Sequence, residues 1–134
     1  MIVGKLTPDA VRLLQARNLA YVATVNDDGS PHLAPMWVDV DPERDLVLLN
    51  TADGRRKVRN LRRDPRIVVS SHDPAHPHPP LIVTGVVERI TTEGALEHID
   101  LLSRKYDDEP WVPREGQVRL ILEVRPDVVA LPLT

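Results

Sequence analysis

Short stretches rich in Val, Leu, Ile and Thr recur along this chain, and residues typical of turns separate most of them. Stretches of this kind are typical of β-strands. The pattern predicts strands at residues 19–25, 31–40, 45–50, 66–70, 81–90, 118–124 and 128–131. The first two flank Asn26-Asp-Asp-Gly-Ser30, a sequence that favours a tight turn, so we expect them to form a hairpin.

Three other segments carry apolar residues at helical spacing. They are residues 8–17, residues 55–63 and a segment from Thr91 or Thr92 to about Tyr106. Thr7 and Pro8 suit the cap and first position of the first helix, and Asp64-Pro65 stops the second. We expect Thr91 or Thr92 to cap the third helix, and His98 to lie on its surface.

Two segments are predicted to be loops. His72 to Pro80 holds four prolines in nine residues, and we expect an exposed loop without regular structure there. Residues 107–116 form a second loop, which carries Trp111.

Six or seven strands, mostly joined as hairpins and accompanied by three short helices, predict a mainly β protein. The expected architecture is a small, mostly antiparallel β-barrel with helices outside it, and an open α+β sheet is the alternative. A length of 134 residues predicts a single domain over residues 1–134.

Composition narrows the functional classes. The chain has no Cys, which excludes a disulfide, a thiolate metal site and a Cys nucleophile. It has no Phe and only two Trp and two Tyr, so we expect an aliphatic core and no nucleic-acid stacking surface. The sequence shows neither a signal peptide nor an apolar segment of membrane-spanning length. We therefore expect a cytoplasmic protein with no membrane or nucleic-acid partner.

One segment concentrates positive charge. The formal net charge is −3, yet seven of the 17 Lys and Arg residues fall between Arg55 and Arg66. Arg55, Arg56 and Lys57 follow a predicted strand and an Asp53-Gly54 turn, at the start of a predicted helix. Backbone N–H groups, the helix dipole and cationic side chains then converge, which favours a phosphate or carboxylate site. For Arg59, Arg62, Arg63 and Arg66, pairing with Asp64 or surface acids is the expected role.

Three segments in this order resemble the split-barrel superfamily of pyridoxamine phosphate oxidase and the actinobacterial deazaflavin-dependent reductases. They are residues 19–38 with Asp28-Gly-Ser-Pro31, residues 47–66, and Leu81-Ile-Val-Thr-Gly-Val-Val-Glu88. The pattern Arg55-x-Lys57-x-x-Asn60-Leu-Arg-Arg-Asp-Pro is similar to the branch that uses coenzyme F420, a deazaflavin with a phospholactyl-oligoglutamate tail.

This resemblance implies a split barrel and a set of cofactor-binding residues. Residues matching Arg55 and Lys57 hold the anionic tail, and Arg56 adds a third cation at that helix start. The residues matching His32, Leu33, Pro35 and Met36 line the ring, with Asn50 and Thr51 near it. The chain lacks the C-terminal Trp-Arg segment of pyridoxamine phosphate oxidases, so pyridoxal formation is not expected.

The resemblance implies an oxidoreductase that uses reduced F420 as hydride donor to reduce a small organic substrate. An FMN-binding oxidase or flavin reductase, and a non-catalytic carrier or sensor of a flavin or deazaflavin, remain alternatives. No catalytic residue is identified, and no metal site is expected, because the prolines around His72, His76 and His78 keep these side chains from converging. A homodimer with the cofactor at the subunit interface is also implied; we expect its second subunit to contribute residues 72–80 or the Trp111 region.

Overall fold

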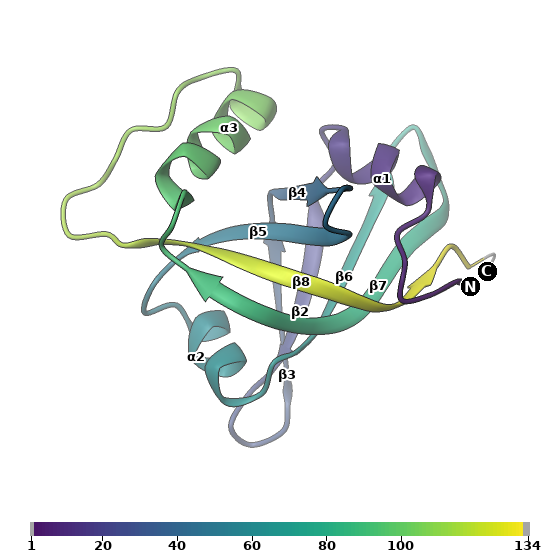
Figure 1. The fold of residues 1–134 in the computed structure, drawn as a ribbon, viewed down its shortest axis with the longest axis horizontal. Helices are drawn as coiled ribbons and strands as arrows, with labels where there is room; N and C mark the ends of the chain where they lie inside the picture. Colours follow the sequence, from purple (N-terminus) through teal and green to yellow (C-terminus); the bar gives the residue numbers. More distant parts are fainter. Residues whose placement is uncertain (1, 133–134) are drawn as a thin grey trace.

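Seven strands follow one another through a continuous antiparallel sheet in the computed structural model, which describes residues 2–132 (Figure 1). Their order is β3-β2-β6-β7-β8-β5-β4, and a short strand, β1 (Ile2–Val3), pairs with β8 beside this path. The seven strands are β2 (Ala20–Val25), β3 (Pro31–Met36), β4 (Val38–Asp41), β5 (Leu46–Ala52), β6 (Arg66–Asp73), β7 (His76–Thr91) and β8 (Arg119–Ala130).

The two ends of this path are neighbours in the chain. β3 and β4 lie at opposite ends of the strand order, yet only Trp37 separates them. A flat sheet would hold them several strand spacings apart, so the sheet has to curl into a half-barrel. The curled antiparallel sheet and its three helices confirm the predicted barrel, and the alternative of an open α+β sheet was wrong.

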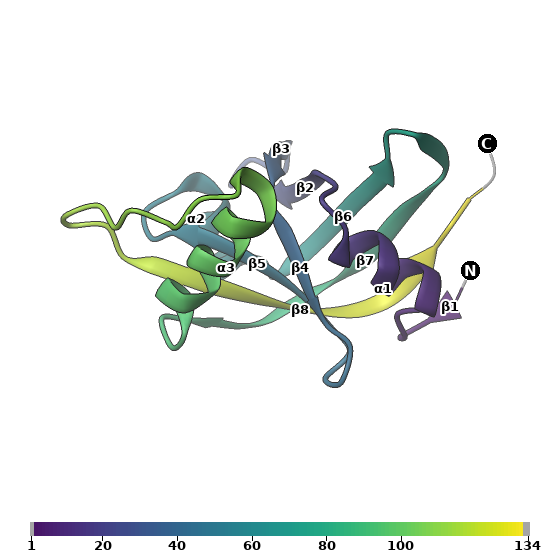
Figure 2. The same cartoon turned by 90° about the horizontal axis from the view of Figure 1, so that it is seen from above.

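Three helices of the described part of the chain surround the sheet (Figure 2). They are α1 (Pro8–Gln15), α2 (Arg56–Arg63) and α3 (Ala95–Asp107). The Thr7 side chain caps α1 as predicted, accepting a hydrogen bond from the Ala10 N–H at 3.1 Å. No helix within residues 2–132 combines the length and the apolar character needed to span a membrane.

The core inside the curl is aliphatic, as the composition predicts. Leu14 of α1 packs there with the inward residues of the strands, among them Leu49, Val69 and Leu122. Apolar side chains on alternate positions face this core, so the residues between them face the outside of the sheet. Burial of these branched side chains is the main force that holds the half-barrel together.

The prediction of an irregular loop from His72 to Pro80 was wrong. β6 continues to Asp73 and β7 begins at His76, so the two strands form a hairpin with Pro74 and Ala75 at its tip. Beyond the pair Ser71–Leu81 the ladder holds only one further pair, Asp73–His76. Because so few residues are paired here, the missing N–H groups of the prolines remove few hydrogen bonds between the strands. The fixed φ of proline also suits extended backbone.

Other boundaries differ from the expectation for local reasons. The expected strand over 31–40 is divided at Trp37, where the sheet ends meet. The two expected C-terminal strands are one strand, β8, which accommodates Pro126 at an irregularity opposite Gly85. Helix α3 starts after Gly94, which adopts left-handed φ, so neither Thr91 nor Thr92 is its cap.

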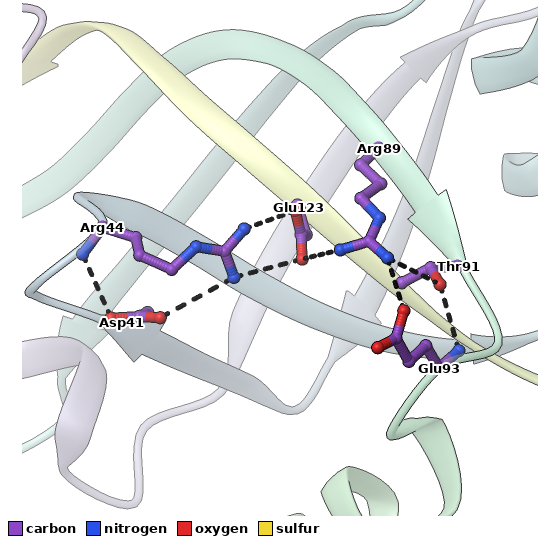
Figure 3. A network of polar contacts seen from close by, with 6 residues as sticks. All are labelled: Asp41, Arg44, Arg89, Thr91, Glu93 and Glu123. Carbon is purple, nitrogen blue, oxygen red and sulfur yellow. Dashed lines mark hydrogen bonds and ion pairs between the residues drawn. The ribbon is translucent and has the colours of Figure 1, made fainter.

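An ionic cluster covers the outer face of the sheet where β8 crosses between β5 and β7 (Figure 3). Glu123, whose side chain is only 6% exposed, accepts from Arg44 at 2.8 Å and lies 3.7 Å from Arg89. Arg89 also pairs with Glu93 at 2.8 Å, and Arg44 with Asp41 at 3.8 Å. A carboxylate this buried depends on its partners for charge compensation.

Replacing Glu123 by Gln keeps the shape of the side chain but removes the charge that both guanidinium groups compensate. We expect the midpoint of thermal unfolding to fall by roughly 5 °C, because hydrogen bonds to charged groups contribute more than neutral ones. Glu115→Gln, at an exposed position of the segment after α3, is the matched control and should leave the midpoint unchanged. Equal midpoints for the two variants would show that the cluster contributes nothing.

Gly85 has no room for a side chain. A Cβ at this position would lie far inside the van der Waals contact distance to the Arg125 carbonyl oxygen, and 3.2 Å from the Pro126 Cα. Gly85→Ala should therefore lower the free energy of unfolding by about 3 kcal/mol, measured by urea titration. Thr84→Ala, on the exposed neighbouring position of β7, should change it by less than about 0.5 kcal/mol. A Gly85→Ala protein as stable as wild type would contradict this packing argument.

Candidate functional site

A cavity of about 380 Å³ lies at one end of the half-barrel. Its walls come from the end of β3, the end of β5, the start of α2, α3, and the segment that runs from α3 to β8 (Figure 1). The residues that line it are Leu19, Pro35, Met36, Trp37, Asn50, Thr51, Arg55, Lys57, Ile99, Trp111, Arg114, Gln117 and Arg119.

The local sequence builds the helix end of this cavity. β5 ends at Ala52, and Gly54 turns the chain with a φ of 91°, a conformation that glycine adopts without strain. Helix α2 then begins with Arg55 at its cap position, where no side chain accepts a hydrogen bond from the first turn. The positive end of the helix dipole and its N–H groups are thereby left for an anion.

Four cations line the cavity, and no carboxylate of residues 2–132 does. Arg55, Lys57, Arg114 and Arg119 form no ion pair with any described residue. Burial lowers the pKa of Lys57, and the nearby charges of Arg55 and Arg119 lower it further. Mutual repulsion of this kind is relieved when an anion enters, so the cavity favours a ligand with several negative charges.

The remaining cations of the basic segment are used differently. Arg62 pairs with Asp53, Arg63 with Asp27, and Arg66 with Asp64. The Arg66 partner, through its hydrogen bonds, lowers the pKa of Asp64 to about 2. These pairs confirm the expectation that Arg62, Arg63 and Arg66 neutralise acids, whereas Arg59 instead donates to the Gly54 carbonyl at 2.6 Å.

Aromatic and aliphatic side chains form the other walls. The guanidinium of Arg119 lies 5.0 Å from the centre of the Trp111 ring, and that of Arg114 lies 5.8 Å from it. Trp37 stacks on Tyr106 with ring centres 5.3 Å apart and planes 3° from parallel. Met36, Trp37 and Trp111 give the cavity apolar walls, suited to an extended ring system with an anionic extension.

The structure brings six of the nine predicted cofactor residues to this cavity and leaves three outside its lining. Pro35, Met36, Asn50, Thr51, Arg55 and Lys57 line it. Leu33 is 65% exposed, and Arg56 is exposed on α2. His32 lies near α2, where burial and the charges of Lys57 and Arg56 lower the pKa of its ring. Whether any of these residues contacts a cofactor stays a prediction.

Sequence reasoning missed the wall opposite α2. Arg114, Gln117 and Arg119 were not singled out, and Trp111 was considered only as a contribution of a second subunit. His98 was expected on the surface, which was wrong, because it is buried 3.0 Å from Asp39. Its spacing from Ala95 and Leu102 on α3 was the signal that places it on the inward face.

Residues 6–131 match the family described as pyridoxamine 5'-phosphate oxidase. The chain belongs to this family. A curated relative, the F420H(2)-dependent biliverdin reductase of Mycobacterium tuberculosis, is 26% identical over 90% of this chain and 84% of its own. A solved structure named F420 reductase is 29% identical, with a TM-score of 0.81, over 90% of this chain and 95% of its own.

A second solved structure shows that the fold is shared more widely. It is a putative pyridoxamine 5'-phosphate oxidase from Listeria innocua, 17% identical, with a TM-score of 0.68 over 92% of this chain and 94% of its own. The family and the F420-related relatives confirm the resemblance predicted from the three sequence segments. Together they support a flavin- or deazaflavin-related oxidoreductase.

Within residues 2–132, no three His, Asp or Glu side chains gather closely enough to hold a metal ion. The cavity walls themselves combine cationic side chains with apolar and aromatic ones.

Proposed function

We propose that the protein uses reduced coenzyme F420 as hydride donor to reduce a small organic substrate. The observation that carries this proposal is the set of four cavity cations that no carboxylate neutralises. The tail of F420 has a phosphodiester and several glutamates, whereas FMN has a single phosphate. Four cations and a free helix N-terminus suit the longer, more negative tail better.

The residues present fit such a cofactor. Arg55, Lys57 and the first turn of α2 would hold the anionic tail, and Pro35 and Met36 would face the ring. The bound cofactor would supply the hydride, while the chain binds, orients and excludes water. Asn50 and Thr51 are buried beside the same cavity and offer polar groups for orientation.

A homodimer is the assembly that we propose for this function. Leu33 of edge strand β3 and Tyr21 of β2 are large and exposed, on the side of the sheet next to the cavity residue Pro35. The β6–β7 hairpin lies at the opposite end of the sheet from α2 in both views, so only a partner's hairpin would reach this cavity (Figures 1 and 2). A second subunit packed on β3 would narrow the opening and shield the ring from solvent.

Reversing two of the cavity cations tests the anion site. Arg55→Glu with Lys57→Glu should weaken F420 binding by roughly 100-fold or more, because two charge-assisted contacts become repulsive. The matched control is Arg62→Glu with Arg63→Glu. It changes the net charge of the protein by the same amount, at the other end of α2 and outside the cavity lining. Trp37 and Trp111 both line the cavity, so intrinsic fluorescence reports the titration. Retained affinity in the first variant would refute the tail site.

The length of the tail separates F420 from FMN. Affinity should fall as F420 forms with fewer glutamates are titrated, since each glutamate carries a charge that the cavity cations attract. FMN should bind more weakly than F420 that carries its full glutamate tail. Affinity independent of tail length, or tighter FMN binding, would favour the FMN-dependent alternative. Binding without turnover of nitro, quinone, lactone or tetrapyrrole substrates would favour the carrier.

A further inference from the structure

Four polar side chains form a hydrogen-bonded chain that begins on β4, passes through α3 and β5, and ends at the cavity wall on β8. Asp39 of β4 lies 3.0 Å from Nε2 of His98 on α3, and Nδ1 of His98 lies 3.2 Å from the Nδ2 of Asn50 on β5. The Oδ1 of Asn50 accepts from the Nε of Arg119 on β8 at 3.0 Å. His98, Asn50 and Arg119 are each no more than 9% exposed.

The donors and acceptors of this chain permit one arrangement. Arg119 only donates, so the Asn50 oxygen must face it and the Asn50 amide NH₂ must face the other way. That NH₂ donates to the Ala95 carbonyl at 2.9 Å and points at the His98 ring. A ring nitrogen facing an NH₂ group has to be the unprotonated one, so Nδ1 of His98 is the acceptor.

The other end of the His98 ring agrees with this assignment. Nε2 then carries the hydrogen and donates to Asp39, which requires an ionised carboxylate. Burial alone raises the pKa of Asp39, but hydrogen bonds from His98 and the Val40 N–H outweigh it and leave the pKa below its ordinary value. Asp39 therefore fixes the tautomer of His98, as carboxylates that accept a hydrogen bond from a histidine ring do in many sites.

We infer that His98 is a positioning residue for anion binding, acting through Asn50 on Arg119. The Nδ1 lone pair, together with the Ala95 carbonyl, holds the Asn50 amide in the rotation that presents its oxygen to Arg119. Arg119 is thereby fixed at the cavity wall, with its guanidinium 5.0 Å from the centre of the Trp111 ring. Its Nη1 also donates to the Gln117 Oε1 at 3.3 Å, and its Nη2 makes no hydrogen bond to a described residue and is available to an anion. The inference rests on the anion-binding part of the proposed function and is independent of which redox cofactor binds.

Two substitutions at His98 separate positioning from packing. His98→Leu keeps an apolar side chain of similar bulk but offers no acceptor, whereas His98→Asn places an amide oxygen close to the position of Nδ1. With inorganic pyrophosphate as the probe, we expect His98→Leu to weaken binding about tenfold and His98→Asn less than about threefold. Glu97→Gln, exposed on the same helix, is the control and should bind as wild type does.

The second readout is the coupling between His98 and Arg119. Arg119→Lys should itself weaken pyrophosphate binding, and adding His98→Leu to it should cause no further loss, because the group being positioned is gone. A loss as large in the Arg119→Lys background as in wild type would overturn the inference. So would pyrophosphate binding by folded His98→Leu protein at wild-type affinity.

Nitrogen NMR of the unsubstituted protein gives a third readout that no folding defect can obscure. The His98 ring should show an unprotonated Nδ1 and a protonated Nε2, and the Arg119 Nε–H should be protected from exchange. The opposite tautomer would overturn the inference. A parallel F420 titration keeps the proposals apart: pyrophosphate binding that depends on His98, in a protein that does not bind F420, would refute the proposed cofactor alone.

Discussion

The structure depends on one connection, the single residue Trp37 between β3 and β4. It holds the two ends of the sheet together, and Tyr106 of α3 fixes it there by stacking on its ring. The Tyr106 hydroxyl donates to the Asn18 carbonyl at 2.6 Å and accepts from the Val38 N–H at 3.1 Å. Lys105 adds hydrogen bonds to the Leu14 and Val38 carbonyls. The end of α3 is thus tied to α1 and β4 at once.

This arrangement also determines where the cavity lies. The chain that leaves the anchored end of α3 passes beside the turn before α2, where the Asp53 N–H donates to the Val118 carbonyl at 2.8 Å, and then enters β8. That path brings Trp111, Arg114 and Arg119 opposite Arg55 and Lys57, which are close to 60 positions away in the sequence. The closure of the sheet and the charge of the cavity are therefore consequences of the same topology.

The sequence predicted the parts of the site whose signal is local. Arg55 and Lys57 stand out because a strand, a glycine turn and a helix start follow one another within a few residues. Arg119 carries no such signal, since only the pairing of β5 with β8 brings it beside Asn50. The hairpin around Pro74 was missed because its existence also depends on strand pairing. Proline disfavours a strand paired on both sides, but the end of this hairpin has only one pair beyond Ser71–Leu81, so its prolines break few hydrogen bonds.

The aliphatic core has a consequence for how this protein is observed. With no Phe in the chain and both Trp residues at the cavity, indole emission reports on the cavity and not on the packed interior. Backbone circular dichroism reports on the sheet instead. If the segment between α3 and β8 opens before the sheet unfolds, the two signals will change at different denaturant concentrations, and a single-transition analysis of fluorescence alone would then measure local opening in place of global stability.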